Sequence, residues 1–462
     1  MSLSCFAVDA AEPATTVTVV PAGDLDDVLG ALDERARAWA QLNGFRAEPG
    51  QWVLLPADDG TLAGVLVGAS DGDFMRAYGG LPGMLPLGAY TLNASTPADT
   101  VRQVALGWGF GAYRFDRYKS QKNRAPASLH IGGGDHREIH ETVEATWLVR
   151  DLVNTPAEDM PPEALHEAAR TLAEAYGAEF SAIVGDELIA ENYPAIHAVG
   201  RASPHAPRLL DFRWGDSDHP KVTIVGKGVC FDTGGLDIKP AGGMLNMKKD
   251  MGGAAHALGL ARMIMAAAMP VRLRVLIPAV ENVIAGNSFK PLDVIRTRKG
   301  LSVEIGNTDA EGRVVLADAL AEADSESPDI IVDFATLTGA ARVALGADLP
   351  AFFCSDDDLA ARTVSGSMAV EDPIWRLPLW SPYRKLISST VADINNAGEG
   401  GMGGAITAAL FLRDFVSLGT PWMHLDTFAW NAFERPGRPK GGEALGMRAV
   451  YAALRDRYAT KG

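Results

Sequence analysis

The sequence predicts an α/β fold with more than one domain. Its apolar runs of strand length are separated by long segments, several of which show helical patterns. Strands that are joined through helices in this way pair in parallel and form a sheet covered on both faces. The chain of 462 residues is also longer than one ordinary domain. We place a domain boundary near residues 121–126, which are polar and turn-prone.

The first third of the chain alternates between strand-like and helix-like patterns. Residues 17–20 form a strand-like run rich in valine. The segment 24–42 begins with an aspartate that can cap a helix and is followed by Asn43-Gly44, which can end it. Residues 51–55 and 62–67 are apolar and flank an Asp-Asp-Gly turn, so they predict a β-hairpin.

Beyond the boundary, helices and strands continue to alternate. One helix is predicted over 138–154, where Thr155-Pro156 ends it. A second is predicted over 163–176, after two prolines, with Gly177 as its C-cap. The apolar runs that predict the strands of the sheet are 209–212, 222–225, 273–278 and 330–334.

Composition and charge exclude several classes of function. The net charge of −16 repels phosphate backbones, so we expect no nucleic-acid partner. The three cysteines are too few for a disulfide framework and form no C-x-x-C pair for zinc. The N-terminus lacks the pattern of a signal peptide. The small apolar stretch 252–269 contains His256 and Arg262, so we interpret it as a buried helix. We therefore expect a cytoplasmic protein without membrane contact.

The stretch VGKGVCFD places Lys227 and Asp232 in a glycine turn after a predicted buried strand. A phosphate-binding loop, a salt bridge and part of a metal site are the three interpretations. A Walker loop requires glycine where Lys221 stands and Ser or Thr where Gly228 stands. A dinucleotide-binding turn requires glycine where Phe231 stands. Both phosphate interpretations fail, which also weakens a phosphoryl-transfer function. The salt bridge remains open, although a buried pair stabilises a fold only weakly.

Two further carboxylates lie in the motif NTDAEGR. Asp309 and Glu311 follow a strand-like run at 301–305 and precede an amphipathic helix predicted at 314–323. Because they are two residues apart, both side chains would face the same way in an extended segment. Asp309 by itself could equally be a helix-start carboxylate that the helix dipole stabilises.

Lys239 and Asp250 lie between these two motifs, and Asp250 by itself could be a helix cap. Taken together, the charged residues predict that carboxylates and lysines gather at the carboxyl ends of strands, where α/β sheets bind ligands. Clustered carboxylates repel one another, so a cation must hold them. Oxygen-rich sites suit hard or borderline divalent metals.

Two metal ions close together would require bridging carboxylates. They would generate hydroxide at neutral pH and polarise a carbonyl group. A lysine binds a metal only as a neutral amine, and a desolvated position beside two dications lowers its pKa enough. This requirement explains why Lys227 would lie at the end of a buried strand.

Three sequence blocks resemble the signatures of the leucine (cytosol) aminopeptidase family. They are GKGVCFDTGGLDIKP at 226–240, MKKDMGGAA at 247–255 and NTDAEGR at 307–313, and the last is highly specific. The resemblance continues through the blocks at 149–156, 333–346 and 392–412. It covers most of residues 145–430, whereas the N-terminal third resembles the family only loosely.

The resemblance implies a site for two divalent metal ions per subunit. Asp232 and Glu311 would bridge the ions, and Asp309 would complete one site. Lys227 and Asp250 would complete the other. Zinc is the metal that the resemblance implies, with manganese or magnesium able to replace it at one site.

Two catalytic residues are also implied by the resemblance. Lys239 would polarise the scissile carbonyl and stabilise the tetrahedral oxyanion. Arg313 would hold a bicarbonate ion that shuttles the proton of the nucleophilic water. The free α-amine of the substrate would bind one metal, which accounts for the specificity of an exopeptidase.

The substrate pocket implied by the resemblance contains Met247, Asn307, Thr336, Leu337 and Gly339. The carbonyl of Leu337 would face the substrate, whereas Met247 and Thr336 could equally be core residues.

The C-terminal wall of this pocket departs from the family. Many members read HLDIAG where this chain reads HLDTFAWN. Phe428 or, with a shift of two residues, Trp430 would then replace a small residue. The preferred first residue of the substrate therefore stays open.

Two histidines and one cysteine are interpreted as packing residues. His256 lies within a predicted helix, and His424 lies in a strand-like run. Cys230 has no histidine beside it in the sequence, so we interpret it as a small buried residue and not as a nucleophile.

The resemblance implies a metal-dependent aminopeptidase with a leucine-like preference. Its fold would have a smaller N-terminal α/β domain at 1–125, a connecting helix at 126–155 and a catalytic domain at 156–462. The catalytic domain would contain a central mixed, mostly parallel sheet covered by helices. A homohexamer, arranged as a dimer of trimers, is implied as well. The alternatives are a dipeptidase of the same family, for example for cysteinylglycine, and a regulatory or nucleic-acid-binding protein that retains the site.

Overall fold

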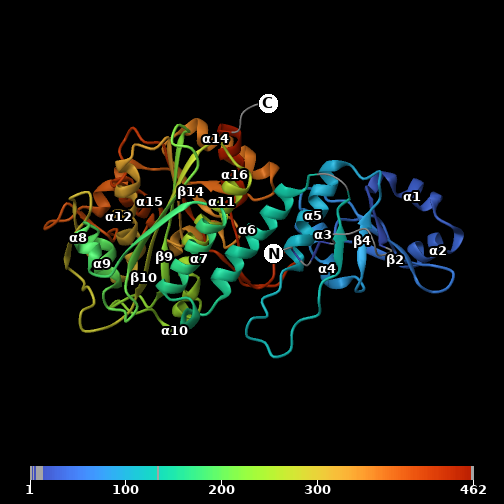
Figure 1. Ribbon diagram of the computed structural model, residues 1–462, viewed down its shortest axis with the longest axis horizontal. Helices are drawn as coiled ribbons and strands as arrows, with labels where there is room; N and C mark the ends of the chain where they lie inside the picture. Colours follow the sequence, from blue (N-terminus) through green and yellow to red (C-terminus); the bar gives the residue numbers. More distant parts are fainter. Residues whose placement is uncertain (1–2, 4, 7–13, 133–134, 459–462) are drawn as a thin grey trace. The chain divides into compact units, whose positions relative to one another are not determined.

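The computed structural model describes residues 3, 5–6, 14–132 and 135–458 (Figure 1). The chain divides into two compact units. The N-terminal unit contains residues 1–147 and 431–440, and the C-terminal unit contains residues 148–430 and 441–462. The dividing point lies within helix α6, Arg137–Asn154, which ends before Thr155 as predicted. The domain limits at 125 and 155 stay a prediction.

The N-terminal unit is built on a five-stranded sheet with the order β2-β3-β1-β4-β5. Its strands are β1 (Thr15–Val20), β2 (Trp52–Pro56), β3 (Leu62–Gly68), β4 (Ala89–Leu92) and β5 (Ser128–His130). The hairpin that the sequence predicts is confirmed, because β2 and β3 pair antiparallel. The other neighbours in this sheet are parallel.

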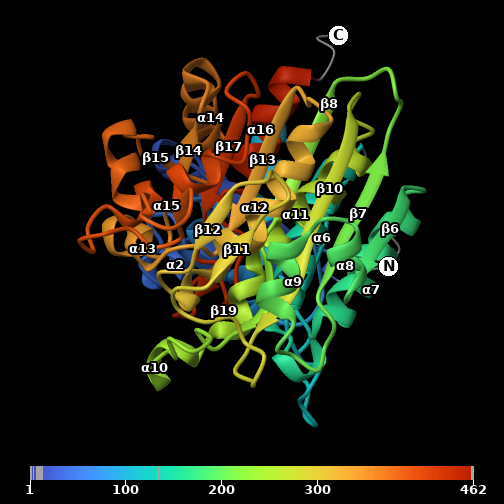
Figure 2. The ribbon, with the colours of Figure 1, turned by 90° about the vertical axis from the view of Figure 1, so that its left-hand side faces the viewer.

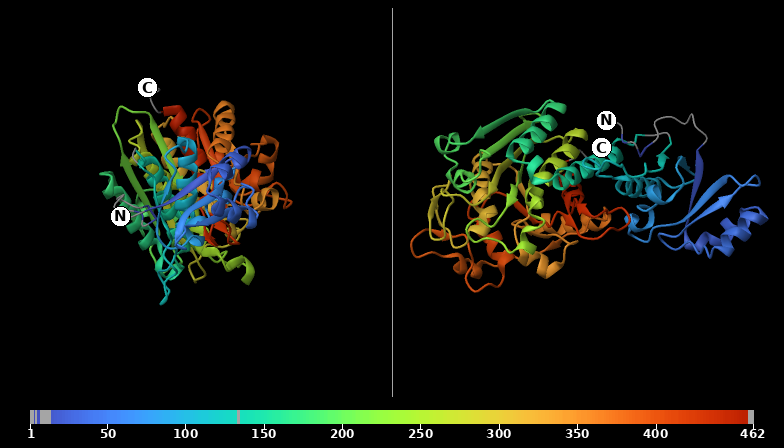
Figure 3. Two further views of the ribbon diagram at one scale, coloured as in Figure 1. Left: turned by 90° about the vertical axis from the view of Figure 1, so that its right-hand side faces the viewer. Right: turned by 90° about the horizontal axis from the view of Figure 1, so that it is seen from below.

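Helices cover both faces of this sheet, which Figure 3 shows from two further sides. Adjacent residues of β3 divide between two buried clusters: Val65 packs with α5, whereas Leu66 packs with α1 and α2. This alternation is what a strand covered on both faces requires. The helices of the unit are α1 (Leu25–Ala31), α2 (Glu34–Leu42), α3 (Phe74–Tyr78), α4 (Leu81–Met84) and α5 (Ala98–Ala112).

The single helix predicted over 24–42 is wrong, because the chain breaks it between α1 and α2. The side chain of Asp33 accepts a hydrogen bond from the Ala36 amide at 2.7 Å and so starts α2. Arg37 donates to the carbonyl oxygens of Leu29 and Leu32, each at 3.0 Å. These bonds satisfy the backbone groups at both sides of the break.

The C-terminal unit is built on a nine-stranded mixed sheet. Its order is β15-β14-β17-β13-β8-β10-β7-β6, and β9 also pairs with β10. The central strands β17, β13, β8 and β10 are parallel, whereas β7, β6 and β14 pair antiparallel with their inner neighbours. The bounds are β6 (Glu179–Val184), β7 (Arg208–Trp214), β8 (Lys221–Gly226), β9 (Gly228–Asp232), β10 (Arg272–Asn282), β13 (Ile330–Ala335), β14 (Ala351–Cys354), β15 (Trp375–Arg376) and β17 (Trp422–Asp426).

Helices pack on both faces of this sheet, as Figure 2 shows. One group packs around α11 and comprises α7 (Pro162–Ala175), α11 (Gly252–Ala266), α14 (Asp357–Ala369) and α16 (Met447–Tyr458). The other group packs around α12 and comprises α9 (Pro194–Gly200), α12 (Glu311–Ser325) and α15 (Gly404–Arg413). The predicted helices at 163–176 and 252–269 are thus confirmed, and Gly177 follows α7 with a φ of +67°.

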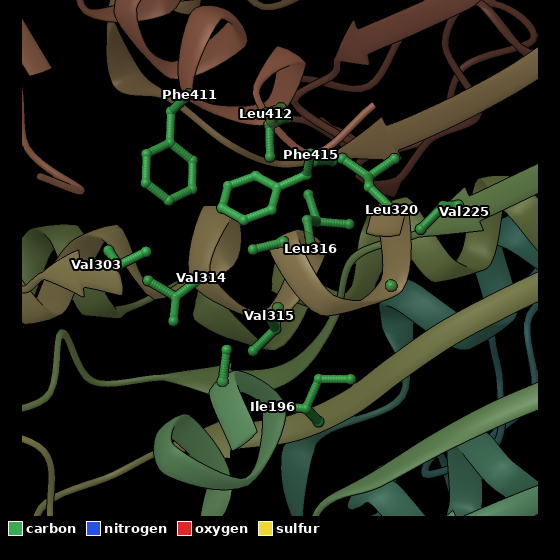
Figure 4. Packing of buried hydrophobic residues seen from close by; sticks show 14 of the residues in the cluster. Ile196, Val225, Val303, Val314, Val315, Leu316, Leu320, Phe411, Leu412 and Phe415 are labelled. Atoms are coloured by element: carbon green, nitrogen blue, oxygen red, sulfur yellow. The ribbon is translucent and has the colours of Figure 1, made fainter. Parts of the chain in front are cut away.

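The helix predicted at 314–323 is confirmed as part of α12, but its predicted amphipathic character is wrong, because α12 is buried almost completely. Figure 4 shows Phe411 and Phe415 on one side of α12 and Ile196 of α9 on the other. Because α15 and the sheet leave α12 little contact with solvent, even its polar residues are enclosed. Helix α12 is therefore a rigid central element whose first residue is Glu311.

Shorter elements connect these layers. They are α8 (Glu187–Ala190), α10 (Ala241–Met244), α13 (Gly339–Leu345), β11 (Val294–Arg296), β12 (Ser302–Glu304), β16 (Ile394–Asn395), β18 (Trp430–Asn431), β19 (Gly441–Gly442) and the 3₁₀ turns Ala22–Asp24, Ala157–Asp159, Met247–Met251, Thr308–Ala310 and Ser381–Ile387. Within the described part of the chain, we find no helix that is both long and apolar enough to cross a membrane.

Candidate metal centre

The glycine turn after β8 lets Lys227 lie deep in the C-terminal unit. A side chain at Gly226 would place its Cβ 2.6 Å from the Cα of Ala254 in α11. A side chain at Gly312 would place its Cβ 2.5 Å from the Cε of Lys227. Only glycine therefore allows α11 and the start of α12 to approach this lysine so closely. The Lys227 side chain is only 4% exposed as a result.

Two carboxylates and one carbonyl surround the amine of Lys227. Its Nζ lies 2.7 Å from Oδ2 of Asp250 and 2.8 Å from Oε1 of Glu311. It also donates a hydrogen bond to the carbonyl oxygen of Thr336 at 3.2 Å. Neither of the two carboxylate oxygens has a hydrogen-bonding partner in a suitable direction among the described residues. The amine of Lys227 thus forms an ion pair with each of the two carboxylates, and the three groups converge on one point.

A second group of charges lies beside the first. Lys239 Nζ is 2.7 Å from Oδ2 of Asp232 and also contacts Asp309. One oxygen each of Asp232, Asp309 and Glu311 lies within 4.8 Å of the others, a spacing that suits ligands of one metal ion. We call Asp232, Asp250, Asp309 and Glu311, with Lys227 and Lys239, the carboxylate cluster.

Burial and crowding perturb the acids of this cluster. Burial, and then the charge of Asp232, raises the pKa of Glu311 to about 8. The same two causes raise the pKa of Asp309 to about 6. Burial also acts on Asp250, but the ammonium groups of Lys227 and Lys249 outweigh it and lower the pKa of Asp250 to about 2. The crowded acids therefore resist a full negative charge unless cations accompany them.

The same fields act on the lysines of the cluster. Burial lowers the pKa of Lys227, but Asp250 and Glu311 outweigh it and raise that pKa above its ordinary value. In Lys239, Asp232 outweighs burial in the same way and raises the pKa. The protein groups alone thus favour an ammonium at Lys227. The neutral amine that the sequence predicts would depend on the charge of divalent ions, and it stays a prediction.

Asp309 and Glu311 come together by a different route from the one that the sequence predicts. They do not lie in an extended segment, because Asp309 is in the 3₁₀ turn Thr308–Ala310 and Glu311 begins α12. The side chain of Asn307 accepts a hydrogen bond from the Asp309 amide at 2.7 Å and starts this turn. Asp250 is also not the cap of α11, since it lies in the 3₁₀ turn Met247–Met251.

Asn282, which the sequence does not mark as a site residue, binds two segments of the carboxylate cluster through hydrogen bonds. It is fully buried at the end of β10. Its Nδ2 donates to Oδ1 of Asp232 at 2.8 Å and to the carbonyl oxygen of Thr308 at 3.1 Å. One amide therefore ties the end of β9 to the turn that carries Asp309. The only sequence signal is a polar residue that ends a long apolar run.

Asp426 at the end of β17 positions the segment that follows β13, which also borders the carboxylate cluster. Its Oδ1 accepts hydrogen bonds from the amides of Leu337 at 3.0 Å and Thr338 at 3.1 Å. The adjoining residue, Thr336, donates from its hydroxyl to Asp250 Oδ1 at 2.8 Å. The segment after β13 is thereby fixed next to the carboxylate cluster.

The cluster opens into a cavity of about 280 Å³. Ten of the residues that the sequence predicts for the site line it: Lys227, Asp232, Lys239, Met247, Asp250, Asp309, Glu311, Thr336, Leu337 and Gly339. Asn307 and Arg313 are not among the described residues that line it. Of the two aromatic residues that the sequence leaves open, Phe428 lines the cavity and Trp430 does not.

Arg313 is buried in the first turn of α12. Its Nη1 donates to the carbonyl oxygen of Asn396 at 2.6 Å, and its Nε lacks a hydrogen-bonding partner among the described residues. Burial lowers the pKa of Arg313 to about 10. A buried guanidinium with an unused N–H group is suited to hold an anion.

The three residues that the sequence assigns to packing are all buried. His256 Nδ1 lies 2.7 Å from the carbonyl oxygen of Gly252, and its Nε2 accepts from the Leu445 amide at 2.9 Å. His424 Nδ1 lies 2.5 Å from Asp333. Burial raises the pKa of Cys230 well above its ordinary value, so its thiol is not activated.

The donor set fits divalent cations. Asp250 Oδ2 and Glu311 Oε1 are buried oxygens without hydrogen-bonding partners in the described structure, and they point at the same amine. Oxygen ligands with one nitrogen, and without thiolates or imidazoles, suit magnesium and manganese and are compatible with zinc. The residues of the carboxylate cluster can therefore hold the metal ions that the sequence predicts.

Comparisons with known proteins agree with this chemistry. A family model described as "Cytosol aminopeptidase family, catalytic domain" matches residues 147–451. A model of the M17 aminopeptidase N-terminal domain matches residues 16–131. A probable cytosol aminopeptidase of Roseiflexus castenholzii is 38% identical over 390 residues, which are 79% of this chain and 78% of the relative.

Solved structures show the same similarity. The crystal structure of the cytosol aminopeptidase from Coxiella burnetii is 48% identical, with a TM-score of 0.94, and the match covers 98% of this chain and 99% of that one. The bottromycin maturation enzyme BotP, in complex with Mn, is 35% identical, with a TM-score of 0.87 and coverage of 96% and 100%. The chain therefore belongs to the cytosol aminopeptidase family of metal-dependent peptidases and is an aminopeptidase, a hydrolytic exopeptidase.

Proposed function

We propose that this aminopeptidase binds two divalent metal ions in the carboxylate cluster and uses them to hydrolyse the first peptide bond of its substrates. The observation that carries the proposal is the convergence of Lys227, Asp250 and Glu311 on one point, with Asp232 and Asp309 beside it. Asp232 and Glu311 would bridge the ions, Asp309 would complete one site, and Lys227 with Asp250 would complete the other. The ions would supply a water of lowered pKa and polarise the scissile carbonyl.

Lys239 is the candidate for stabilising the developing oxyanion. Its Nζ lines the cavity next to Asp232, and its pKa is raised, so it carries a positive charge. An ammonium held in place by two carboxylates needs little reorganisation when the carbonyl oxygen gains charge. It would donate to that oxygen in the transition state.

Arg313 is the proposed binding residue for a bicarbonate ion. Its unused Nε–H supports this role, because a buried N–H group without a partner favours an anion. With that anion bound, Arg313 would hold a base in the site for the proton of the attacking water. The Asn396 carbonyl, which holds Nη1, would keep the guanidinium oriented.

The substrates proposed are peptides with a free N-terminal amine. The proposed metals are zinc, with manganese or magnesium at one site; the similar enzyme BotP was solved with Mn, which supports manganese. A cytoplasmic location is proposed from the names of the relatives. We also propose a homohexamer, on the resemblance of the sequence to the family. The leucine-like preference stays a prediction, because Phe428 lines the cavity where many family members have a small residue.

Chelation tests the metal proposal. Purified protein should contain about two equivalents of metal, lose its activity on leucyl peptides after dialysis against a chelator, and regain it with zinc or manganese. N-acetylated peptides should remain intact, because they lack the free amine. If metal-replete protein cleaves no first residue from a broad panel of peptides, the proposed function is wrong.

Two variants test the assignment of residues. Lys227→Ala and Asp309→Ala should lose bound metal, measured by elemental analysis, together with activity. Lys290→Ala is the matched control, because its amine lies outside the cavity and contacts only the carbonyl oxygen of Ser288. Full metal content in both site variants would refute the assignment. Cleavage of dipeptides such as cysteinylglycine, but of no longer peptide, would favour the dipeptidase alternative.

A further inference from the structure

The cavity is lined by two cations that do not belong to the carboxylate cluster. They are Lys249 and Arg342, which line it together with Phe428. The Nζ of Lys249 lies 5.4 Å from the centre of the Phe428 ring, and the guanidinium carbon of Arg342 lies 4.5 Å from it. Two cations thus flank the aromatic residue that stands where many family members have a small one.

Of these two cations, Arg342 alone lacks a carboxylate partner among the described residues. No acid of the described residues forms a salt bridge with Arg342, and Lys249 is 3.4 Å from Asp250 Oδ1. The other oxygen of Asp250 lies 2.7 Å from Lys227. In charge, the four acids of the cluster match two divalent ions. The charge of Arg342 then remains available to a ligand in the cavity, and Lys249, which shares Asp250 with Lys227, adds a second positive charge nearby.

Phe428 leaves the donors of Arg342 free. A guanidinium that lies over an aromatic ring contacts the ring with its flat face. The N–H groups of the guanidinium point outward in the guanidinium plane and do not bind the ring. Those groups match a carboxylate with two parallel hydrogen bonds. The Lys249 side chain is 5% exposed and is therefore held in one position, in a wall where water screens its charge weakly.

The position of these residues relates them to the first residue of the substrate. Arg342 is one turn into α13, which begins at Gly339, and Lys249 is two residues after Met247. Gly339 and Met247 belong to the predicted substrate pocket and line the same cavity. Lys239 and the cluster, where the bond would be cut, line the cavity as well.

We propose that this pocket selects peptides whose first residue is acidic, Asp or Glu, over those that begin with leucine, and rejects those that begin with Lys or Arg. Arg342 is the main specificity-determining residue, and Lys249 assists it. The inference rests on the proposed aminopeptidase function and specifies its substrate class.

The test compares amidated tripeptides that differ only in the first residue: Glu, Asp, Leu or Lys, each followed by Ala-Ala. Amidation removes the C-terminal carboxylate, so the first side chain is the only acid that the cations can bind. With metal-replete full-length protein, kcat/KM should be highest for Glu or Asp and at least about 100-fold lower for Lys. Leucine should lie between them.

Variants assign the selection to the cations. Arg342→Met should lower the ratio of kcat/KM for Glu to that for Leu by about 10- to 100-fold, and Lys249→Met should lower it less. Arg342→Glu should reverse the order of Glu and Lys. Arg362→Met, on the exposed side of α14, is the matched control and should leave all ratios unchanged. Because each ratio is measured within one variant, partial misfolding does not affect it.

The outcomes separate this inference from the proposed function. Efficient cleavage of the Leu peptide, with no preference for Glu over Leu or Lys, overturns the acidic selection and leaves the aminopeptidase function intact. An unchanged ratio in Arg342→Met overturns the role of Arg342. If none of the peptides is cleaved by metal-replete protein, both proposals fall together.

Discussion

Two buried clusters of charge lie at opposite ends of α12, and they differ in balance. The carboxylate cluster includes Glu311, the first residue of the helix. The second cluster, which we call the arginine network, lies near the last turns and consists of Arg213, Arg274, Arg298, Asp211, Glu322 and Glu326. At its centre, Arg274 lies 2.7 Å from Asp211, 2.6 Å from Glu322 and 3.1 Å from Glu326.

This difference in charge balance indicates that the arginine network stabilises the fold, whereas the carboxylate cluster binds a ligand. The arginine network matches three cations with three acids. Although burial acts against the charge of Glu326, Arg274 and Arg213 outweigh it and lower the pKa of Glu326. In the carboxylate cluster the shift of Glu311 has the opposite sign, since burial and Asp232 raise its pKa to about 8, whereas Asp250 keeps a lowered pKa beside Lys227 and Lys249. Acids that are stabilised as anions need no further partner, whereas acids that are destabilised require one.

The largest effect is expected for Glu311→Gln. Glutamine keeps the size of the side chain but removes one negative charge and one metal ligand. Activity should fall by more than about a thousandfold, because the reaction loses the activated water. The metal-free variant should nevertheless be as stable to denaturant as the metal-free parent, since one crowded anion is gone. A large loss of stability without loss of metal would contradict the contrast between the two clusters.

Arg274→Met should have the opposite profile. Its side chain is 5% exposed, and its loss would leave Asp211 and Glu322 buried with fewer cations. Removing one partner of a buried ion pair costs about 3–5 kcal/mol, so the free energy of unfolding should fall by that amount. Denaturant titration measures this loss, and metal content per folded protein should stay at the parental level. Arg296→Met, at an exposed position of β11, is the control and should change stability by less than about 0.5 kcal/mol.

The local parts of the carboxylate cluster could be predicted from the sequence. Lys227 and Asp232 lie five residues apart, and Asp309 and Glu311 lie in one motif, so each pair is visible in a short window. Their meeting depends on the order of the strands, in which β8 lies between β10 and β13 and β9 pairs with β10. The residue types alone predict a metal at this site. The resemblance of the sequence blocks to the family indicates that both pairs belong to the same site.

The arginine network could not be predicted from the sequence. Arg274 is 63 residues from Asp211 and 48 from Glu322, and no motif links them. Only the antiparallel pairing of β10 with β7 and the packing of α12 bring them together. The break between α1 and α2 was missed for a similar reason, because Arg37 stabilises it from outside the segment that ends. The predicted amphipathic pattern of α12 failed because its buried polar residues find partners inside: Glu322 pairs with Arg274, and Asp318 accepts hydrogen bonds from backbone amides.

Asn282 distinguishes the two clusters further, because it is an uncharged residue that positions the acids of the carboxylate cluster. Its amide donates to Asp232 and to the Thr308 carbonyl, so it positions two segments of the carboxylate cluster without adding charge. Asn282→Ala should weaken metal binding by about 10- to 100-fold, because partners of metal ligands contribute that much. Competition with a metal-binding dye measures this affinity without reference to activity. Stability of the metal-free variant should fall less than in Arg274→Met.

Asn287→Ala provides the matched control for this last variant. Asn287 is exposed in the loop after β10 and donates only to the carbonyl oxygen of Arg201. Its removal should leave metal affinity unchanged. If Asn282→Ala binds metal as tightly as the parent, the acids of the cluster are positioned by their own segments, and the amide serves the fold alone. If it loses metal while keeping its stability, the carboxylate cluster depends on its neighbours for orientation, whereas the arginine network is held by its own charges.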